Sequence, residues 1–318
     1  MNAVECKVTA ADGKSWELPQ VYAWDICHTF GSPCDSFDVR LPFTAQCREI
    51  LEKAVYFSAD HNGKAVFRGI VDEFEIDFSA KGAAVSIRGR GMQARLLDNE
   101  AESAQHYMLS FETLLDTYVR PFGIDNIDVG RAFGAKGAMT VDSGTSCWNV
   151  VSSFCKFHAD TMPRFSADGT FCVDGEKGGN TLIVDDTIPI SSLNYCEDRY
   201  GVISSVIVKN KARGTKTLVS NGKYSEKGLS CRRVITVPRS TRYDAMRHTG
   251  AYQIAQSECA LITLQITVPW EFAAFAGDTV IFDHSLTGLK GKYIVYESQC
   301  TADAEGVRTK LELRSDRD

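Results

Sequence analysis

The strongest constraint on the fold of this sequence is a likeness between its two ends. Residues 70–90 align without a gap with residues 294–314, a separation of 224 residues, and share six identities in 21 positions. Self-similarity at a fixed separation is typical of a repeated structural unit. A chance likeness between two hairpins is the alternative. The identical pairs are Ile70 and Ile294, Val71 and Val295, Glu73 and Glu297, Ala80 and Ala304, Gly82 and Gly306, and Arg90 and Arg314.

Both copies of this segment have the pattern of antiparallel strands. Residues 66–78 end in alternating apolar and acidic side chains, which places one side of the strand in a core and the other in water. Asn62-Gly63 precedes them and supplies the positive φ that a tight hairpin needs. We therefore predict a first β-barrel domain over residues 1–100 and a related second β-barrel domain, with a helix near residues 244–258, over residues 181–318.

Residues 101–180 have a different period and predict an α+β insert domain. Ser110 is expected to cap a helix over residues 111–119, and a second helix is expected near Thr145. Asp168-Gly169 has the chemistry of a hairpin turn. The predicted fold class is mainly β with an α+β insert: two related small β-barrels flank a helix-containing domain.

The composition is that of a globular protein. Hydrophobic residues make up 44% and charged residues 24% of the 318 residues, which excludes a disordered or low-complexity chain. No stretch reaches the roughly 18 consecutive apolar residues of a membrane helix, so we expect no membrane insertion. The eleven cysteines form no C-x-x-C pair, and an odd total cannot pair fully, so we interpret them as reduced thiols of a protein made in a cytosol.

Sequence motifs of known enzymes are missing. There is no H-E-x-x-H, G-x-S-x-G or Walker motif, and no two of the six histidines have metal-ligand spacing. The best nucleophile is Cys147 or Cys155 with His158, but these residues share a predicted helical stripe with Trp148 and Phe154, which favours a core position. We predict no catalytic residue, no metal and no cofactor. A cysteine hydrolase or a cell-wall hydrolase is the alternative.

Positive charge is concentrated between Arg199 and Arg247. This span holds twelve Lys and Arg residues against Glu226 and Asp244, a net charge of +10 that leaves −16 elsewhere. Docking onto an acidic protein surface, including a neighbouring copy, is the preferred interpretation. A solvated hairpin is one alternative, and nucleic-acid binding, for which interleaved aromatic residues are lacking, is another. The candidate interface residues are Lys209, Lys211, Arg213, Arg232, Arg233 and Trp270, with core packing as the alternative for Trp270.

Several runs of the sequence resemble phage baseplate hub proteins of the Mu, late-control-D and T4-like types. Val66-Phe67-Arg68-Gly69-Ile70-Val71-Asp72 and Val85-Ser86-Ile87-Arg88-Gly89-Arg90-Gly91 are similar to the amino-terminal domain of that family. Ala276-Gly277-Asp278-Thr279-Val280 and Gly291-Lys292-Tyr293-Ile294-Val295 are similar to its closing barrel, where a Gly-Asp turn precedes a strand. The resemblance covers nearly the whole chain. No part of the chain resembles an attached lysozyme or peptidase domain.

The resemblance implies a structural role. Three copies would form a ring of six barrels that adapts a sixfold tail tube to a threefold spike, in the baseplate of a contractile phage tail or a tail-like injection particle. The implied partners are a second and third copy of the chain, the tail tube protein, the spike protein and other baseplate proteins. DNA would pass through the lumen without specific binding, which suits a trimer charge of −18. The implied location is the virion tail baseplate, assembled in the cytoplasm of the bacterial host. A tube-capping tail-tip protein of a non-contractile phage is the alternative.

Overall fold

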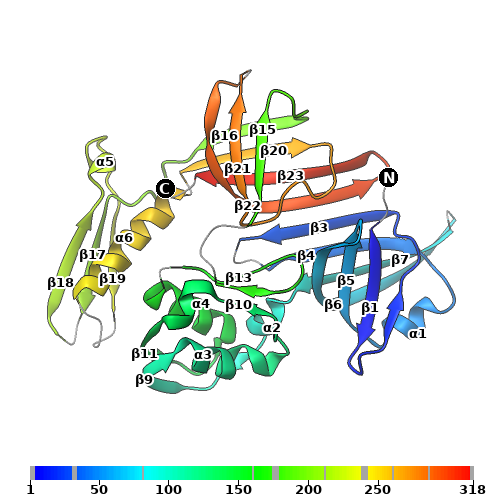
Figure 1. Cartoon of the computed structure of the whole chain (residues 1–318), viewed down its shortest axis with the longest axis horizontal. Helices are drawn as coiled ribbons and strands as arrows, with labels where there is room; N and C mark the ends of the chain where they lie inside the picture. The colour runs from blue at the N-terminus through cyan, green and yellow to red at the C-terminus, as the bar shows by residue number, and fades with distance from the viewer. Residues whose placement is uncertain are drawn as a thin grey trace.

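The computed structural model describes residues 4–30, 34–80, 82–159, 161–173, 179–210, 213–237, 243–259, 261–285 and 287–315. The chain is mostly β, as predicted, and its largest element is a 13-stranded sheet built from both ends of the chain. Figure 1 shows the two halves of this sheet meeting at the middle of the molecule, with the helix-containing insert below the upper half and beside the lower one.

The first part of this sheet is curved around a core of its own. Its strands follow the order β3-β4-β7-β6-β5-β1-β2. Asn62 and Gly63 have φ of 51° and 72° at the β5–β6 turn, which confirms the predicted hairpin. The buried side chains include Ile26, Val39 and Phe67. The elements are β1 (Glu5–Ala10), β2 (Ser15–Glu17), β3 (Ala23–Thr29), β4 (Ser36–Pro42), α1 (Cys47–Leu51), β5 (Ala54–His61), β6 (Lys64–Ser79) and β7 (Gly82–Gly91).

The second part has the same strand order around a second core. It runs β16-β20-β23-β22-β21-β15, with Leu264, Val280 and Leu311 among its buried side chains. Each of its strands has a counterpart in the first part, where the order β3-β4-β7-β6-β5-β1 matches it and only β2 is additional. The elements are β15 (Thr181–Asp185), β16 (Ser192–Glu197), β20 (Ile262–Val268), β21 (Thr279–His284), β22 (Leu289–Asp303) and β23 (Gly306–Ser315).

Local details confirm that the two curved sheets are a repeat. The β6–β7 ladder has a register shift between Val71 and Glu73, and the β22–β23 ladder has one between Val295 and Glu297, again 224 residues apart. The two hairpins turn on glycines with the same φ of 119°, Gly82 and Gly306. One strand differs, because β1 is antiparallel to β5 whereas β15 is parallel to β21.

The two repeats are joined edge to edge, which the sequence pattern does not reveal. The second half of β22 pairs in antiparallel fashion with β3, from Glu297 with Thr29 to Ala302 with Trp24. We call this pairing the internal seam. It makes one sheet of the two predicted barrels, and β3 lies directly beside β22 in Figure 1.

The predicted insert is a compact helical unit on one side of the seam. Ser110 accepts a hydrogen bond from the main-chain amide of Thr113 and caps α3, as predicted. The core lies between α3 and α4 and includes Leu114, Val151 and Phe154. The elements are α2 (Ala94–Leu97), β8 (Glu100–Ala101), β9 (Ala104–Ser110), α3 (Phe111–Tyr118), η1 (Arg120–Phe122), β10 (Ile127–Asp128), η2 (Gly130–Gly134), β11 (Lys136–Val141), β12 (Thr145–Ser146), α4 (Cys147–His158), β13 (Arg164–Phe165) and β14 (Phe171–Cys172).

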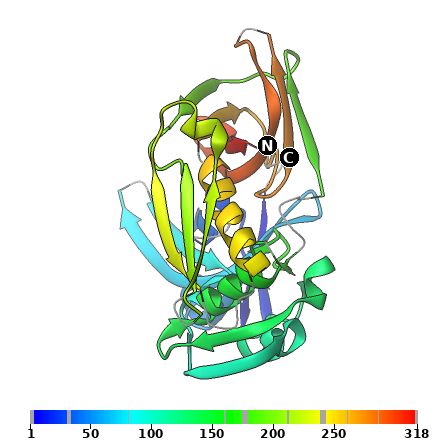
Figure 2. The ribbon, with the colours of Figure 1, turned by 90° about the vertical axis from the view of Figure 1, so that its left-hand side faces the viewer.

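A further small unit interrupts the second repeat between β16 and β20. It consists of β17 (Ser205–Asn210), β18 (Thr215–Ser220), α5 (Gly222–Ser225), β19 (Arg232–Thr236) and α6 (Tyr243–Cys259), with the sheet order β18-β17-β19. Helix α6 confirms the helix predicted near residues 244–258. Figure 2 shows that it lies along one face of the small sheet. Gly250 allows this close packing, because a side-chain carbon there would lie 2.6 Å from Val219.

Candidate assembly interface

The internal seam shows how one repeat of this protein binds another. Its inward-facing pairs include Cys300 with Ile26 and Ala302 with Trp24, which are buried and apolar, and the buried polar pair Ser298 with His28. On the opposite face, the Gln299 side chain donates to both carboxylate oxygens of Asp25, at 3.0 and 2.9 Å. Burial raises the pKa of the Asp25 carboxyl, and the hydrogen bond from Gln299 opposes that shift. The seam therefore combines main-chain pairing with an apolar face and a polar face.

Ion pairs cover the face of the sheet that points away from the cores. Arg88 on β7 donates to Asp38 on β4 at 2.9 Å and to Glu73 on β6 at 2.5 Å. In the second repeat, Arg314 donates to Glu312 at 2.8 Å, and its guanidinium lies 3.2 Å from the centre of the Tyr296 ring. These arginines are therefore held by neighbours on the same sheet.

The outer face of the small sheet brings together two of the predicted interface residues. Lys209 on β17 and Arg232 on β19 point away from α6, and Lys216 on β18 lies directly opposite Lys209. Directly opposed like charges destabilise a sheet, so an acidic group bound between the two lysines would relieve their repulsion. We call this surface the basic face.

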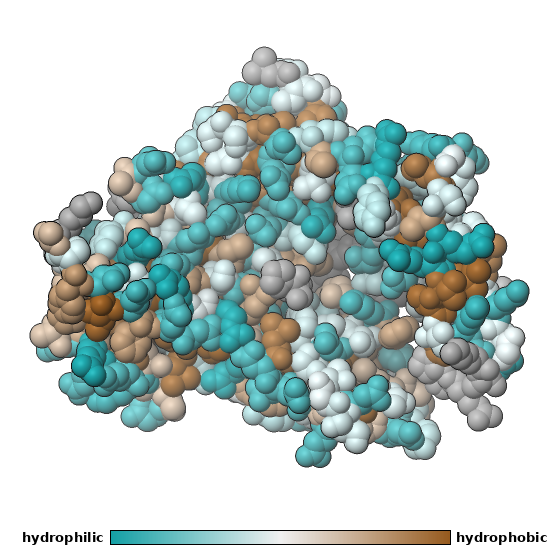
Figure 3. All heavy atoms as spheres, turned by 180° about the vertical axis from the view of Figure 1, so that it is seen from behind, coloured by the Kyte–Doolittle hydropathy of each residue, from teal (hydrophilic) through white to brown (hydrophobic). Residues whose placement is uncertain are grey.

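An apolar row crosses the basic face, and sequence reasoning missed it. Ile207, Leu218 and Val234 are neighbours on the three strands, and Leu218 and Val234 are 61% and 53% exposed. Figure 3 shows hydrophobic atoms gathered at this end of the molecule, on its right-hand side. The alternation of the strands could not reveal the row, because the buried face of the same strands is also apolar.

The other predicted interface residues lie elsewhere. Arg233 pairs with buried Val206 and so leaves the sheet on the side of α6, and Arg213 lies in the β17–β18 turn. Lys211 lies outside the described residues. Trp270 is half-buried after β20 in the second repeat, where its main-chain oxygen accepts a hydrogen bond from Thr309. A role for these four residues in assembly stays a prediction.

A pocket of about 410 Å³ lies where both repeats and the insert meet. Burial raises the pKa of the Asp278 carboxyl in its wall, while hydrogen bonds from nearby main-chain amides and the positive charge of Arg164 oppose that shift. Arg164 belongs to the insert and Asp278 to the second repeat, so this pocket brings opposite charges from these two parts of the chain near each other.

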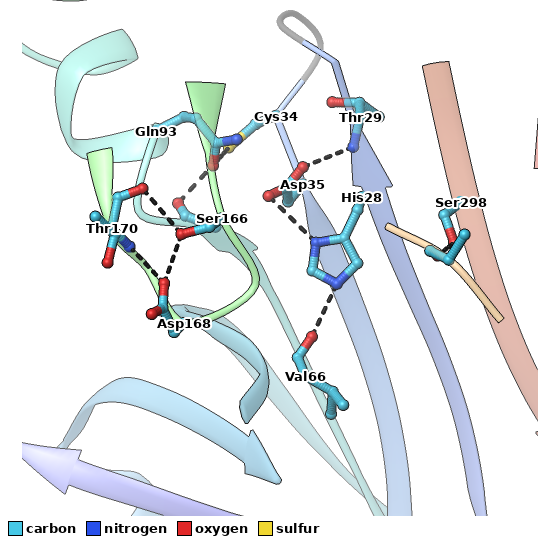
Figure 4. Close-up of polar contacts among 12 residues, drawn as sticks. His28, Thr29, Cys34, Asp35, Val66, Gln93, Ser166, Asp168, Thr170 and Ser298 are labelled. Carbon is cyan, nitrogen blue, oxygen red and sulfur yellow. Dashed lines mark hydrogen bonds and ion pairs between the residues drawn. The ribbon is translucent and has the colours of Figure 1, made fainter. Parts of the chain in front are cut away.

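The pocket contains serine, histidine and aspartate, but their geometry is not that of a catalytic triad. His28 donates from Nε2 to the main-chain oxygen of Val66 at 2.8 Å, and its Nδ1 lies 3.5 Å from Asp35. The Ser166 hydroxyl instead donates to Asp168 within its own turn (Figure 4). A serine nucleophile needs a histidine nitrogen as its base, and His28 Nε2 is directed at a carbonyl. These contacts support the architecture of the junction.

The cysteine site considered from the sequence is not arranged for catalysis. Cys155 is fully buried on α4, and burial raises the pKa of its thiol to about 12. Burial also lowers the pKa of His158, whose ring packs against Phe154 at 4.7 Å. A nucleophilic cysteine needs a low thiol pKa and access for the substrate, and Cys155 has neither.

The described residues contain neither a metal-binding cluster nor a membrane-spanning helix. No cluster of three or more His, Cys, Asp or Glu side chains in that part of the chain could hold a metal ion. Within the same residues, no helix is both long enough and apolar enough to cross a membrane.

Solved structures with this fold come from phage tails and related particles. The chain superposes on the tail protein from Neisseria meningitidis MC58 with a TM-score of 0.79 and 19% identity, over 99% of this chain and 97% of that one. The 43 kDa tail protein of prophage MuSo2 from Shewanella oneidensis gives a TM-score of 0.76 and 16% identity, over 98% of each chain. The E. coli c3393 protein, described as a type VI secretion component with similarity to T4 tail proteins gp27 and gp5, gives 0.58 and 10% identity, over 93% and 74%.

No family model matches the sequence, and no curated protein matches it. The structural matches show that the chain has the fold of phage tail proteins, as the resemblance implied.

Proposed function

We propose that this protein is a structural baseplate hub. Three copies form a ring of six related repeats that joins a sixfold tail tube to a threefold spike, in a contractile phage tail or a tail-like injection particle. The observation that carries the proposal is the repeat itself: one chain holds two equivalent curved sheets already joined edge to edge. Three such chains would offer six similar positions to a sixfold partner.

Similar solved structures also support this role. Two structural neighbours that match over nearly all of this chain are a tail protein and a prophage tail protein, and the c3393 protein is named as a component of a type VI secretion system. We extend from these proteins to this chain a place in a virion tail or tail-like particle, assembled in the bacterial host cytoplasm. Tail tube, spike and other baseplate proteins are the proposed partners.

The charge pattern suits a ring with a DNA-conducting lumen. Arg88 and Arg314 are bound by carboxylates of their own sheet, and the net charge of a trimer is −18. Proteins bind DNA phosphates through Lys and Arg side chains that are not already paired. A lumen lined by the sheet face that carries Arg88 and Arg314 would therefore let DNA pass without specific binding. The basic face would then serve an acidic protein partner.

Two alternative functions were considered from the sequence. A tube-capping tail-tip protein of a non-contractile phage would use the same fold, and a sheath gene beside this one favours the contractile assignment. A cysteine hydrolase is not supported, because the Cys155 thiol is buried and has a raised pKa.

The proposal is tested by the mass and shape of the assembled protein. Native mass spectrometry of the full chain is expected to show a species of three 35.0 kDa chains. Electron microscopy of that species should show a ring with six similar densities around a channel. A protein that stays a 35.0 kDa monomer, both alone and in particles, contradicts the hub assignment.

A further inference from the structure

The strand-by-strand equivalence of the two repeats indicates where a second seam would form. β22 is equivalent to β6, and β3 is equivalent to β16, because each pair has the same neighbours in its sheet. In the internal seam, the part of β22 beyond its bulge pairs with β3. The counterpart of this seam would join the part of β6 beyond its bulge to β16.

Both of these edges are open in the described part of the chain. β6 pairs with β5 only as far as Ile70, and its second half pairs with β7 alone. β16 pairs with β20 alone. The two edges lie at distant positions of the shared sheet order, and the free end of the β6–β7 hairpin projects from the body in Figures 1 and 2. An open strand edge is a template for pairing with another chain.

The internal seam also fixes the register of the proposed pairing. Trp24 and Ile26 of β3 correspond, through their pairing partners, to Leu193 and Tyr195 of β16. Ala302 and Cys300 of β22 correspond to Phe78 and Ile76 of β6. The expected partners are therefore Phe78 with Leu193, Ile76 with Tyr195, Glu75 with Cys196, Asp77 with Asn194 and Phe74 with Glu197.

The apolar side chains at these positions are like those of the internal seam, but they are at least partly exposed to solvent in a single chain. In the internal seam the apolar pairs are buried, with Ile26 0% and Ala302 2% exposed. At the equivalent outer positions, Phe78 is 72% and Tyr195 is 41% exposed. Pairing would therefore place two exposed large hydrophobic residues opposite apolar partners, Leu193 and Ile76, as in the internal seam.

We propose that β6 of one copy and β16 of the next copy form an antiparallel seam that repeats the internal seam between chains. The contact uses different surfaces on the two copies, so it passes from chain to chain and gives a ring when the rotation between copies closes. The occupant of each edge is a second copy of this chain. The closure at three copies rests on the proposed hub function, whereas the strand pairing rests on the repeat.

A single cysteine substitution tests the register. In Glu75→Cys, the new thiol would lie directly opposite the exposed native Cys196 of the next copy, within the Cα separation of about 4.4–6.8 Å that a disulfide needs. Mild oxidation of the assembled protein is expected to give a covalent trimer on a non-reducing gel. Cys196→Ser added to Glu75→Cys should abolish it.

Asp77→Cys is the matched control, since it lies on the same face and strand but diagonally from Cys196, at roughly 7–8 Å. Cross-linking through Glu75→Cys and not through Asp77→Cys supports the proposed seam. A native trimer whose Glu75→Cys variant does not cross-link overturns the seam and leaves the hub function standing. A monomer without cross-links overturns both.

Discussion

The Gln299 side chain binds both carboxylate oxygens of Asp25, at 3.0 and 2.9 Å, although the two residues are 274 positions apart in the chain. This contact lies on the polar face of the internal seam, where the first and last thirds of the chain become one sheet. Because burial raises the pKa of Asp25, its ionised form costs folding free energy that the Gln299 hydrogen bonds only partly offset.

Asp25→Asn is expected to change the pH dependence of stability. A carboxyl with a raised folded pKa stabilises the fold below its unfolded pKa, and this contribution is lost as the pH rises through the folded value. The asparagine keeps an acceptor for Gln299 without the charge. The variant should therefore equal the wild type near pH 3, below the unfolded pKa, and be more stable near pH 7, by less than about 1.4 kcal/mol for a half-buried group. Urea unfolding at both pH values measures this, and a variant less stable at pH 7 contradicts it.

The hairpin glycines of the two repeats should respond alike to substitution. Gly82 and Gly306 both have φ of 119°, and no atom lies within 4 Å of an added side-chain carbon, so Gly→Ala acts through backbone strain alone. We expect each alanine to lower the free energy of unfolding by about 1–3 kcal/mol. Gly134→Ala, also in open space but without positive φ, should stay within about 0.5 kcal/mol. Denaturant titration of the three variants decides this, and clearly unequal effects at Gly82 and Gly306 would speak against equivalent hairpins.

These glycines also explain what the sequence could predict. The two hairpin turns need a positive φ, which favours glycine, so Gly82 and Gly306 are identical and helped to make the repeat visible. Helix α3 was equally predictable, because the Ser110 cap is a local hydrogen bond.

The internal seam was not predictable in this way. Alternation in β3 and β22 tells which face of each strand is buried, but not which strands pair across 274 residues. The apolar row of the basic face was hidden for a related reason, since both faces of β17 carry apolar side chains around Ile207.

Tyr195→Arg should prevent assembly without unfolding the protein. Tyr195 is 41% exposed in the free chain, so an arginine there should change the free energy of unfolding by no more than about 1 kcal/mol. In the proposed seam the same arginine would lie against apolar Ile76, and burying its charge there is unfavourable even with Glu197 two residues along the same strand. Sedimentation velocity should show monomers for this variant and trimers for Tyr200→Arg, whose site is 94% exposed beyond the end of β16. Trimers of Tyr195→Arg would argue against the register.

Alkylation should separate the buried from the exposed thiols. At pH 8 the Cys155 thiol, with a pKa of about 12, is almost wholly protonated and is also shielded from solvent, whereas Cys196 is exposed. Iodoacetamide is expected to modify Cys196 in the native monomer and Cys155 only after denaturation, as read by peptide mass spectrometry. Particles carrying Cys155→Ala should keep their infectivity. Rapid native labelling of Cys155, or loss of infectivity by a folded Cys155→Ala protein, would revive a catalytic role.

Lys209→Glu should have opposite effects on stability and on assembly. Lys209 and Lys216 lie directly opposite each other on neighbouring strands, so a glutamate at 209 replaces a repulsion with an attraction and should stabilise the isolated protein by about 0.2–1 kcal/mol. The same change removes positive charge from the basic face, so binding of an acidic partner should weaken and particle incorporation should fall.

The control is Lys223→Glu, which makes the same charge change on α5, off the basic face. Urea unfolding and quantitative incorporation into particles provide the two readouts. We expect Lys223→Glu to leave incorporation unchanged and Lys209→Glu to reduce it, with the wild-type value falling as salt screens the contact. If Lys209→Glu is incorporated as well as the wild type, the lysines of the basic face are solvated, and a partner of the small sheet must bind its apolar row instead.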